Sequence, residues 1–433
     1  MLLEKPKVLV VGAGPVGMFA ALALAKQGVP VQIVDTGLWA CSHSYALALH
    51  AQSLELLESV GLLDQVWAAA NPIRTIGLYD ATGRKAEIRM DGVSVPALAV
   101  VRQSALEDLL EEGLRTLNVR VLWRHEVAGV NTNSDHVSAT VSKLKKKFTK
   151  DFDIVRTEWM GSRTNSVDAD FVLGADGHNS QIRRALAFDF PEVAPAQYYA
   201  VFEFKSDAPG NDETRIVLGE RTTDVLWPLP DGDYRWSFQL PDYSDTEAEQ
   251  LKDRLLSAGF GHFPTKRLKD RVPAVIDLGV PPALDKEHLE ALIADRAPWF
   301  TGSIDALSWR TIVRFERRLA SRFGEGRVWL AGDSAHLALP AGIQSMNLGL
   351  LEANELAHTF ARLLSGEGSS SELTDYNDRW TEVWRRVHGL EGGLRPTAQT
   401  DPWIKDRADR LLACLPAHGQ ALAQLAEQLG LEI

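Results

Sequence analysis

Short apolar runs alternate with helical stretches at the start of the chain. Residues 8–11 and 31–34 are rich in β-branched side chains and end at glycine or aspartate, as buried parallel strands do. Residues 18–26, between them, have the alanine and leucine content of a helix. This order predicts an α/β domain built on a parallel sheet.

The middle of the chain has a different pattern. Residues 198–204, 223–229 and 234–240 alternate between apolar and polar positions, with a turn at Pro230-Asp231-Gly232, which is typical of an antiparallel sheet. Short strands are also expected at residues 76–97, 119–123 and 137–141. Helices are expected at residues 51–69, 102–117, 245–258, 286–297 and 345–363.

A G-x-G-x-x-G pattern follows the first strand. The first glycine permits a tight turn, the second lets a phosphate approach the backbone, and the third lets helix and strand pack closely. A pyrophosphate would then lie at the positive end of the helix dipole. Asp35, 18 residues after the last glycine, would accept hydrogen bonds from ribose hydroxyls, which favours FAD or NAD over NADP. The turn consists of Gly12, Gly14, Pro15, Val16 and Gly17.

Two later segments also combine a strand with glycine and aspartate. One strand ends at Asp176-Gly177 and another at Gly332-Asp333. An ionised aspartate is an acceptor only, which suits the hydroxyls of a ribityl chain. The helix expected from residue 345 would direct its first amides at the pyrimidine edge of a flavin, which becomes more negative on reduction. The three segments together predict one flavin nucleotide, FAD.

The order of these segments predicts a discontinuous domain. We expect an α/β fold whose Rossmann-type FAD-binding domain comprises residues 1–75, 98–185 and 301–375. An antiparallel-sheet substrate domain, residues 76–97 and 186–300, interrupts it. Residues 376–433 are expected to form a helical C-terminal segment.

Composition restricts the partners. The 433 residues carry a net charge of −12, which argues against nucleic acids and anionic membranes. Neither a signal peptide nor an apolar run of about 18 residues is recognised, so no membrane span is expected. Two cysteines, Cys41 and Cys414, are consistent with a reducing compartment, and a cytoplasmic location is predicted. The basic run at residues 143–150 is interpreted as a solvated hairpin or insertion. No metal-ligand cluster is recognised, and the oligomeric state stays open.

On these motifs the chain resembles the FAD-dependent aromatic hydroxylases, the single-component flavoprotein monooxygenases of the para-hydroxybenzoate hydroxylase type. The resemblance covers roughly residues 5–380. Besides the three glycine-bearing segments, it includes two shorter matches, Ser180-x-x-Arg183 and Glu352-Ala353-x-Glu355-Leu356. The cofactor-binding residues that it implies are Gly12, Gly14, Pro15, Val16, Gly17, Asp35, Arg102, Gln103, Asp176, Gly177, Gly332, Asp333, Pro340, Gly342, Ile343, Gln344, Ser345, Met346 and Asn347.

The resemblance also implies a reaction. FAD would be tightly bound and NADPH or NADH would be a transient reductant. Oxygen from O2 would reach an aromatic or polycyclic small molecule through a C4a-hydroperoxyflavin. The cofactor carries this chemistry, while the protein supplies position, polarity and exclusion of water. No catalytic side chain is therefore assigned, and His336 is interpreted as a packing or flavin-edge residue rather than an acid–base catalyst.

Three positions depart from the pattern of that family. Tyr45 stands where an arginine usually helps to hold the FAD phosphate and the nicotinamide. Ile343 and Ser345 stand in a loop that commonly has more glycine, and their Cβ atoms restrict the backbone. These changes leave open whether the mobile-flavin reduction cycle of the family operates here.

The substrate pocket is expected between the antiparallel sheet and the flavin ring. Trp227, Trp236 and Phe238 are candidates for an aromatic lining, and Arg235 is a candidate for holding an anionic group. The same aromatic residues would also serve as sheet core. The neutral strands favour a large hydrophobic substrate, whose identity, site of oxygenation and nicotinamide preference these residues do not determine.

Two other functions stay open on the sequence. FAD-dependent reductases of isoprenoid-type substrates have similar FAD motifs, and related architectures can bind a nucleotide without turnover. A flavin-dependent halogenase is disfavoured, because the Trp-x-Trp-x-Ile-Pro stretch of those enzymes is absent.

Overall fold

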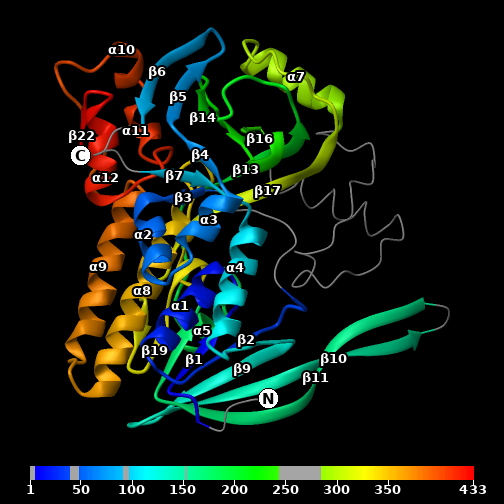
Figure 1. Cartoon of the computed structure of the whole chain (residues 1–433), viewed down its shortest axis with the longest axis vertical. Helices are drawn as coiled ribbons and strands as arrows, with labels where there is room; N and C mark the ends of the chain where they lie inside the picture. The colour runs from blue at the N-terminus through cyan, green and yellow to red at the C-terminus, as the bar shows by residue number, and fades with distance from the viewer. Residues whose placement is uncertain (1–4, 40–47, 91–96, 152–153, 243–283) are drawn as a thin grey trace.

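The structure, a computed structural model, describes residues 5–39, 48–90, 97–151, 154–242 and 284–433. Figure 1 shows a small parallel sheet flanked by long helices in the lower half and a larger sheet in the upper half. The predicted α/β class is confirmed.

The parallel sheet has six strands in the order β18-β19-β12-β1-β2-β8, of which only β18 runs antiparallel to its neighbour. Its four central strands are buried on both faces except at the edge residue Asp35, which explains their continuous apolar sequences. Helix α1 (Pro15–Lys26) packs against α4 (Gln103–Thr116) and α8 (Gln344–Ser365). The strands are β1 (Val8–Val11), β2 (Val31–Asp35), β8 (Val121–Trp123), β12 (Phe171–Gly174), β18 (Gly324–Glu325) and β19 (Val328–Leu330).

The larger sheet has eight strands in the order β20-β17-β13-β16-β15-β14-β5-β6, antiparallel except for the pair β14–β5. Strand β17 was expected within the FAD-binding part of the chain, but it pairs with β13 and so extends the larger sheet. The strands are β5 (Thr75–Asp80), β6 (Gly83–Arg89), β13 (Glu192–Lys205), β14 (Glu213–Leu218), β15 (Thr223–Pro228), β16 (Asp233–Gln239), β17 (Leu307–Leu319) and β20 (His336–Leu337).

The two faces of the larger sheet have different neighbours. On one face, alternate residues of β13 and β16 form a buried cluster with α7 (Lys286–Arg296). On the other face, β13, β15, β16 and β17 face the loop that precedes α8. Alternation along each strand therefore separates a structural face from a face directed at the FAD-binding half.

Some elements differ in extent from the prediction. The helix expected at residues 51–69 is two helices, α2 (Ala51–Ser59) and α3 (Leu63–Ala69), because Gly61 between them has φ +73°. The basic run lies on β10 (Val137–Asp151), which pairs with β9 (His125–Thr132) and with β11 (Ile154–Ala169) in a hairpin that extends away from the body in Figure 1. The helix expected at residues 245–258 lies outside the described residues.

The end of the chain is mostly helical, as predicted. Helix α9 (Ser371–Val387) runs beside α8. The following residues, 394–433, which we call the C-terminal segment, pack in one apolar cluster with β5, β6, β14, β15 and loop residues Ala341 and Ile343. The segment contains α10 (Pro402–Lys405), α11 (Ala408–Leu411), α12 (Gly419–Glu427), β21 (Arg395–Pro396) and β22 (Leu431–Glu432).

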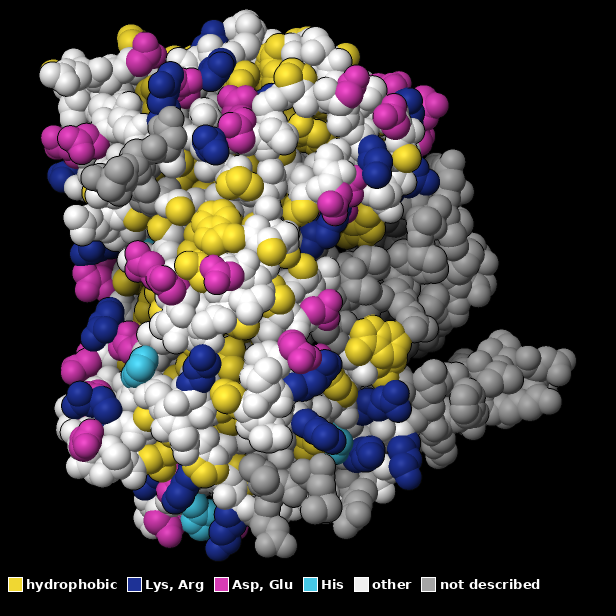
Figure 2. Space-filling model, in the orientation of Figure 1, with side chains coloured by type: hydrophobic (Ala, Val, Ile, Leu, Met, Phe, Trp, Pro, Cys, Tyr) yellow, Lys and Arg dark blue, Asp and Glu magenta, His cyan; other side chains and the backbone are white. Residues whose placement is uncertain are grey.

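A third, small sheet joins the two halves; it consists of β3 (Ala48–His50), β4 (Asn71–Ile73) and β7 (Leu98–Val100). On the face shown in Figure 2, acidic and basic side chains are interspersed over the described surface. Among the described residues, no helix combines the length and the apolar character that crossing a bilayer requires.

Candidate functional site

The three glycine-bearing segments lie side by side. Each follows one of three adjacent parallel strands, β1, β12 and β19. The Ala175 amide donates to the Val11 carbonyl at 2.7 Å, and the Ala331 amide donates to the Gly174 carbonyl at 3.0 Å. Stretches of chain more than 150 residues apart in sequence thus end at one edge of the sheet, where ligands bind in open α/β sheets.

The glycines of the first turn meet two different requirements. A Cβ on Gly12, whose φ is +106°, would lie 2.1 Å from the Ala175 carbonyl oxygen, and one on Gly17 would lie 2.0 Å from the Gly12 carbonyl oxygen. These two glycines are needed for the chain to pack against itself. A Cβ on Gly14 would have no described atom within 4 Å. The side of the turn beside Gly14 is therefore open, as a phosphate-binding turn requires.

Helix α1 starts at this turn with an uncapped end. Pro15 is its first residue, Gly14 offers no side-chain cap, and the first turn contains no acidic residue. The first amides of a helix carry partial positive charge and need acceptors. The open side of Gly14 and this uncapped end fit the pyrophosphate of FAD, which the amides of Val16 and Gly17 would hold.

Asp35 has a structural role that the sequence did not reveal. Its carboxylate accepts the Ala13 amide at 2.7 Å and the Gly37 amide at 2.5 Å, which ties the glycine turn to the end of β2. A carboxylate offers about four lone-pair sites, so these two hydrogen bonds do not by themselves exclude ribose hydroxyls.

Asp176 caps a helix with one oxygen and leaves the other without a partner. Oδ2 accepts the amides of Gln181, at 2.6 Å, and Ile182, at the start of α5 (Gln181–Ala185). Oδ1 is buried and has no hydrogen-bond partner among the described residues. Burial raises the pKa of this carboxyl. A buried acceptor without a donor fits a hydroxyl of a bound nucleotide, and the adjacent Gly177, with φ +76°, has open space where a Cβ would lie.

Arg183 joins the second segment to the third. Its guanidinium donates to the carbonyls of Ser334, at 2.7 Å, and His178, at 2.8 Å, and its side chain is buried. The Ser180-x-x-Arg183 match is thereby explained, since Ser180 Oγ accepts the Arg183 amide at 2.9 Å.

Behind the exposed Asp333 lies a fully buried polar cluster. The Glu352 carboxylate accepts the Gly332 amide at 2.8 Å and the Trp384 indole N–H at 2.7 Å, and it lies 2.9 Å from His336 Nε2. The His336 ring stacks on Trp384 at a centroid distance of 3.6 Å. His336 is therefore a packing residue, and the cluster fixes the backbone that presents Asp333.

The loop that leads into α8, residues 338–344 with Gln344 as the first helical residue, contains a strained residue. Ile343 is the N-cap of α8, has φ 48° and ψ 45°, and is 8% exposed. A β-branched residue is rare in this left-handed conformation. Ile343 was expected from the sequence to restrict the backbone of this loop. In the structure a buried isoleucine occupies a conformation that glycine would adopt without strain.

Side chains in this region bind other parts of the protein. The side-chain oxygen of Asn347 accepts the His50 backbone N–H at 2.8 Å. Its side-chain nitrogen donates to the Ala48 and Ile343 carbonyls at 2.9 and 2.8 Å. Ser345 Oγ accepts the Ala338 amide at 3.1 Å. Helix α8 has neither a side-chain cap nor an acid in its first turn, so its first backbone amides are the groups suited to a flavin edge.

The C-terminal segment anchors the same loop. Gln344 Nε2 donates to the carbonyls of Leu415, at 2.8 Å, and Ala417, at 3.0 Å. A Cβ on Gly342 would lie 2.8 Å from the Ala413 carbonyl oxygen, and His50 Nε2 lies 2.9 Å from the Gly342 carbonyl oxygen. The loop is thus held from both sides by residues outside it.

Arg102 and Gln103, which the resemblance assigned to the cofactor, also have protein partners. Arg102, the N-cap of α4, donates to Glu203 at 2.9 Å and to Asp233 at 2.6 Å. Gln103 donates to Glu107 at 2.8 Å. Arg102 thereby ties the FAD-binding half to the larger sheet.

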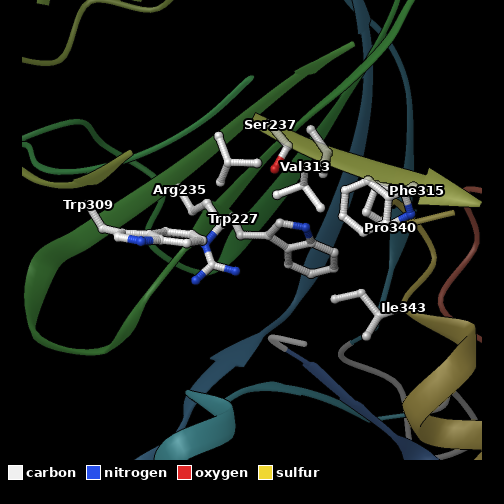
Figure 3. A pocket seen from close by; sticks show the side chains of 10 residues that line it. Trp227, Arg235, Ser237, Trp309, Val313, Phe315, Pro340 and Ile343 are labelled. Atoms are coloured by element: carbon white, nitrogen blue, oxygen red, sulfur yellow. The ribbon is translucent and has the colours of Figure 1, made fainter. Parts of the chain in front are cut away.

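A cavity lies between the larger sheet and the loop, where the substrate pocket was expected. Its lining is mostly apolar and aromatic, and Figure 3 shows Trp227, Trp309 and Phe315 along it with Ile343 at its lower side. We call it the sheet cavity. Its lining residues are Val201, Val225, Trp227, Arg235, Ser237, Trp309, Val313, Phe315, Pro340 and Ile343.

The predicted substrate residues divide between the two faces of the sheet. Trp227 and Arg235 line the sheet cavity. Trp236 and Phe238 lie on the opposite face, stacked at 4.7 Å within the cluster that α7 covers. Because β16 alternates, residues 235 and 237 share one face and residues 236 and 238 the other. Trp309, Val313 and Phe315 on β17 were missed, although their odd-numbered alternation was readable in the sequence.

Arg235 is paired within the cavity wall. Its Nε donates to Glu203 Oε1 at 2.8 Å, and its Cζ lies 5.2 Å from the centre of the Trp309 ring. Burial alone would raise the pKa of Glu203, but Arg235 and Arg102 outweigh it, so the pKa is lower than usual. Glu203 is therefore ionised at neutral pH.

Two sequence positions of interest lie outside the described residues. Tyr45, at which the family pattern is broken, and Cys41 belong to residues 40–47. Cys414 is buried within the C-terminal segment, and burial raises its thiol pKa to about 12.

Comparisons with known proteins agree with this geometry. The profile of the family described as FAD binding domain matches residues 5–258 and 279–389. An uncharacterized aromatic compound monooxygenase of Bacillus subtilis is 29% identical over 401 residues, 92% of this chain and 69% of the relative. The 6-methylpretetramide 4-monooxygenase of Streptomyces rimosus is 26% identical over 86% of this chain and 58% of its own length.

The fold has close counterparts among solved structures. The crystal structure of p-nitrophenol 4-monooxygenase from Pseudomonas putida superimposes with a TM-score of 0.66, covering 99% of this chain and 94% of that one at 20% identity. The fold of that enzyme is therefore the fold of this chain. The chain spans between about three fifths and two thirds of the length of the two sequence relatives above.

Proposed function

The chain belongs to the FAD binding domain family, and from this premise we propose that it is an FAD-dependent monooxygenase. It would use NAD(P)H and O2 to hydroxylate or otherwise oxygenate an aromatic or polycyclic small molecule. The observation that carries the proposal is the convergence of the three glycine-bearing segments at one sheet edge, beside an aromatic-lined cavity.

The relatives support this proposal over the two alternatives. Both sequence relatives are named as monooxygenases, one of an aromatic compound and one of 6-methylpretetramide. Neither of these relatives is named as a reductase of isoprenoid-type substrates or as a non-catalytic nucleotide-binding module.

The residues have separable tasks in this reaction. When bound, FAD supplies the redox chemistry, taking reducing equivalents from NAD(P)H and activating O2. The turn at residues 12–17 and Asp35 would bind its ADP half, and Asp176 and Asp333 would accept hydrogen bonds from its hydroxyls. The amides at the start of α8 would stabilise negative charge at the flavin edge. The sheet cavity would orient the substrate and exclude water.

A pair of glycine variants tests the cofactor site. Gly14→Ala places a Cβ in open space, so the apoprotein should fold with unchanged thermal stability. That Cβ occupies the space that a phosphate needs, so the Kd for FAD should rise at least about tenfold. Fluorescence titration of apoprotein with FAD measures the change. If Gly14→Ala binds FAD as the unchanged protein does, the turn does not hold the pyrophosphate.

Gly17→Ala is the matched control. Its Cβ meets the Gly12 carbonyl oxygen at 2.0 Å, so this variant should lose stability even without FAD.

Turnover is then tested by NAD(P)H oxidation and 18O2 incorporation against a panel of phenols. FAD binding without oxygen incorporation into any member would reject the monooxygenase assignment.

A further inference from the structure

The sheet cavity has a charge arrangement that bears on which substrates it accepts. Arg235 is the only cationic residue in the described lining. Two guanidinium groups, of Arg102 and Arg235, face two carboxylates, of Glu203 and Asp233. Glu203 and Arg235 are only 5% and 3% exposed. The described wall of the cavity is therefore electrically neutral.

The register of the larger sheet fixes this pairing. Glu203 on β13 lies opposite Arg235 on β16 and opposite Trp309 on β17, and Arg235 lies opposite Trp227 on β15. One row across four strands thus reads indole, carboxylate, guanidinium, indole. Directly opposite residues in a sheet are held within contact distance. If Arg235 turned toward a ligand, the buried Glu203 carboxylate would lose one of its two cationic partners.

The polar group that can recognise a ligand in this cavity without charge is the hydroxyl of Ser237. Ser237 lies opposite Val201 and Val225 in the neighbouring row, and Figure 3 shows its hydroxyl among the apolar side chains of the lining. A hydroxyl both donates and accepts, so it can bind a phenol, an amide or a carbonyl without charge. The remaining surface is two indoles, a phenyl ring and aliphatic groups, which favour a flat apolar ring.

We propose that the sheet cavity selects uncharged aromatic substrates and rejects aromatic carboxylates. A carboxylate that entered would lose its hydration and find the one lining guanidinium already paired, and an uncompensated buried charge is costly. The inference rests on the proposed function, since it assigns the substrate of that oxygenation to this cavity. It replaces the anion-holding role expected of Arg235.

Ligand pairs of equal shape test the selection in the FAD-loaded protein. The probes are 4-hydroxybenzamide against 4-hydroxybenzoate, and 6-hydroxy-2-naphthamide against 6-hydroxy-2-naphthoate, at pH 7.5. Binding is read from the perturbation of the flavin absorbance, without turnover. We expect each amide to bind at least about tenfold more tightly than its acid. Equal or tighter binding of the acids, or no binding of the amides, overturns the proposal.

A charge variant tests the cause. Glu203→Gln removes the partner of Arg235 and keeps the shape, so the acids should gain at least about tenfold in affinity relative to the amides. Asp233→Asn is the matched control, because it also removes one negative charge but leaves the Arg235–Glu203 pair; its ratio should stay within about threefold of the original. An unchanged ratio in Glu203→Gln, or the same shift in both variants, contradicts the role of the pair.

These outcomes are distinct from failure of the proposed function. A protein that binds the amides selectively but incorporates no oxygen retains the cavity assignment and loses the monooxygenase assignment. If Glu203→Gln does not fold, the ligand pairs on the unchanged protein still decide the selectivity.

Discussion

Single residues in this chain often have a partner that their motif does not indicate. Asp35 holds the glycine turn, Gln344 binds two carbonyls of the C-terminal segment, and Arg102 binds two carboxylates of the larger sheet. A motif identifies a residue type at a position, but its hydrogen bonds are completed by residues distant in sequence. Ile343 shows the opposite case, in which the conformation is unfavourable for the residue present.

Because of the strain at Ile343, we expect glycine at this position to give a more stable protein than alanine, the reverse of the usual order. Ile343→Gly and Ile343→Ala both lose the side-chain atoms beyond Cβ, but only alanine, which keeps Cβ, keeps the cost of the left-handed conformation, about 1–2 kcal/mol for an L-residue. The glycine variant should therefore be more stable than the alanine variant by about 1 kcal/mol, measured by urea denaturation.

Met346 supplies the comparison at a neighbouring buried position. It lies within α8, where alanine is favoured over glycine by up to about 1 kcal/mol. Met346→Ala should thus be more stable than Met346→Gly. The same order at Ile343 as at Met346 would mean that residue 343 is not in the left-handed region.

At the scale of elements, loop 338–344 depends on the C-terminal segment. Gln344 connects the loop to Leu415 and Ala417, and Arg410 connects the same segment to the turn between β14 and β15 through the carbonyls of Gly219, at 2.7 Å, and Thr222. The segment follows the residues that the family profile matches. It joins loop 338–344 to the larger sheet through these hydrogen bonds.

Gln344→Met keeps the length of the side chain and removes its donor. Amide hydrogen exchange should become faster both in residues 340–347 and in residues 411–418, because each group then lacks its partner. Gln428→Met is the control, since Gln428 binds the backbone of Arg89 at the sheet edge. Faster exchange confined to residues 340–347 would show that the C-terminal segment does not depend on this contact.

At the scale of the whole molecule, His50, His388 and His418, which are wholly or partly buried, have pKa values below the usual range. Burial lowers the pKa of His50 to about 3, with a further lowering by His418, and lowers that of His418 to about 4. Burial and the nearby His336 lower the pKa of His388 to about 4. All three are neutral in the folded protein at pH values where they would be protonated in the unfolded chain.

Acid should therefore destabilise the protein before most carboxylates titrate. Between pH 6.5 and about 4 the unfolded chain binds more protons than the folded one, so the free energy of unfolding falls as pH falls, by on the order of 1 kcal/mol per pH unit for each histidine. Urea denaturation at pH 8, 7, 6 and 5 measures the slope. His418→Gln should reduce it; an unchanged slope would mean that His418 is protonated in the fold.

Much of the geometry of the candidate cofactor site was predictable from the sequence, because its signals are local. Gly12, Gly17 and the strand before them encode a turn whose packing admits no side chain, and the order of strands and helices determines the α/β class. Sequence spacing alone identified the three segments that meet at the edge of the parallel sheet. The resemblance to the flavoprotein monooxygenases rests on those segments.

The sheet cavity was decided only by the tertiary structure. Alternation along β16 shows that Arg235 and Trp236 lie on opposite faces, but only the position of α7 makes one face structural and the other a cavity wall. Likewise, the charge of Arg235 is balanced by Glu203, which the register of β13 against β16 places beside it. Local sequence determines the conformation of each strand, whereas a charge pair and a cavity depend on which strands become neighbours.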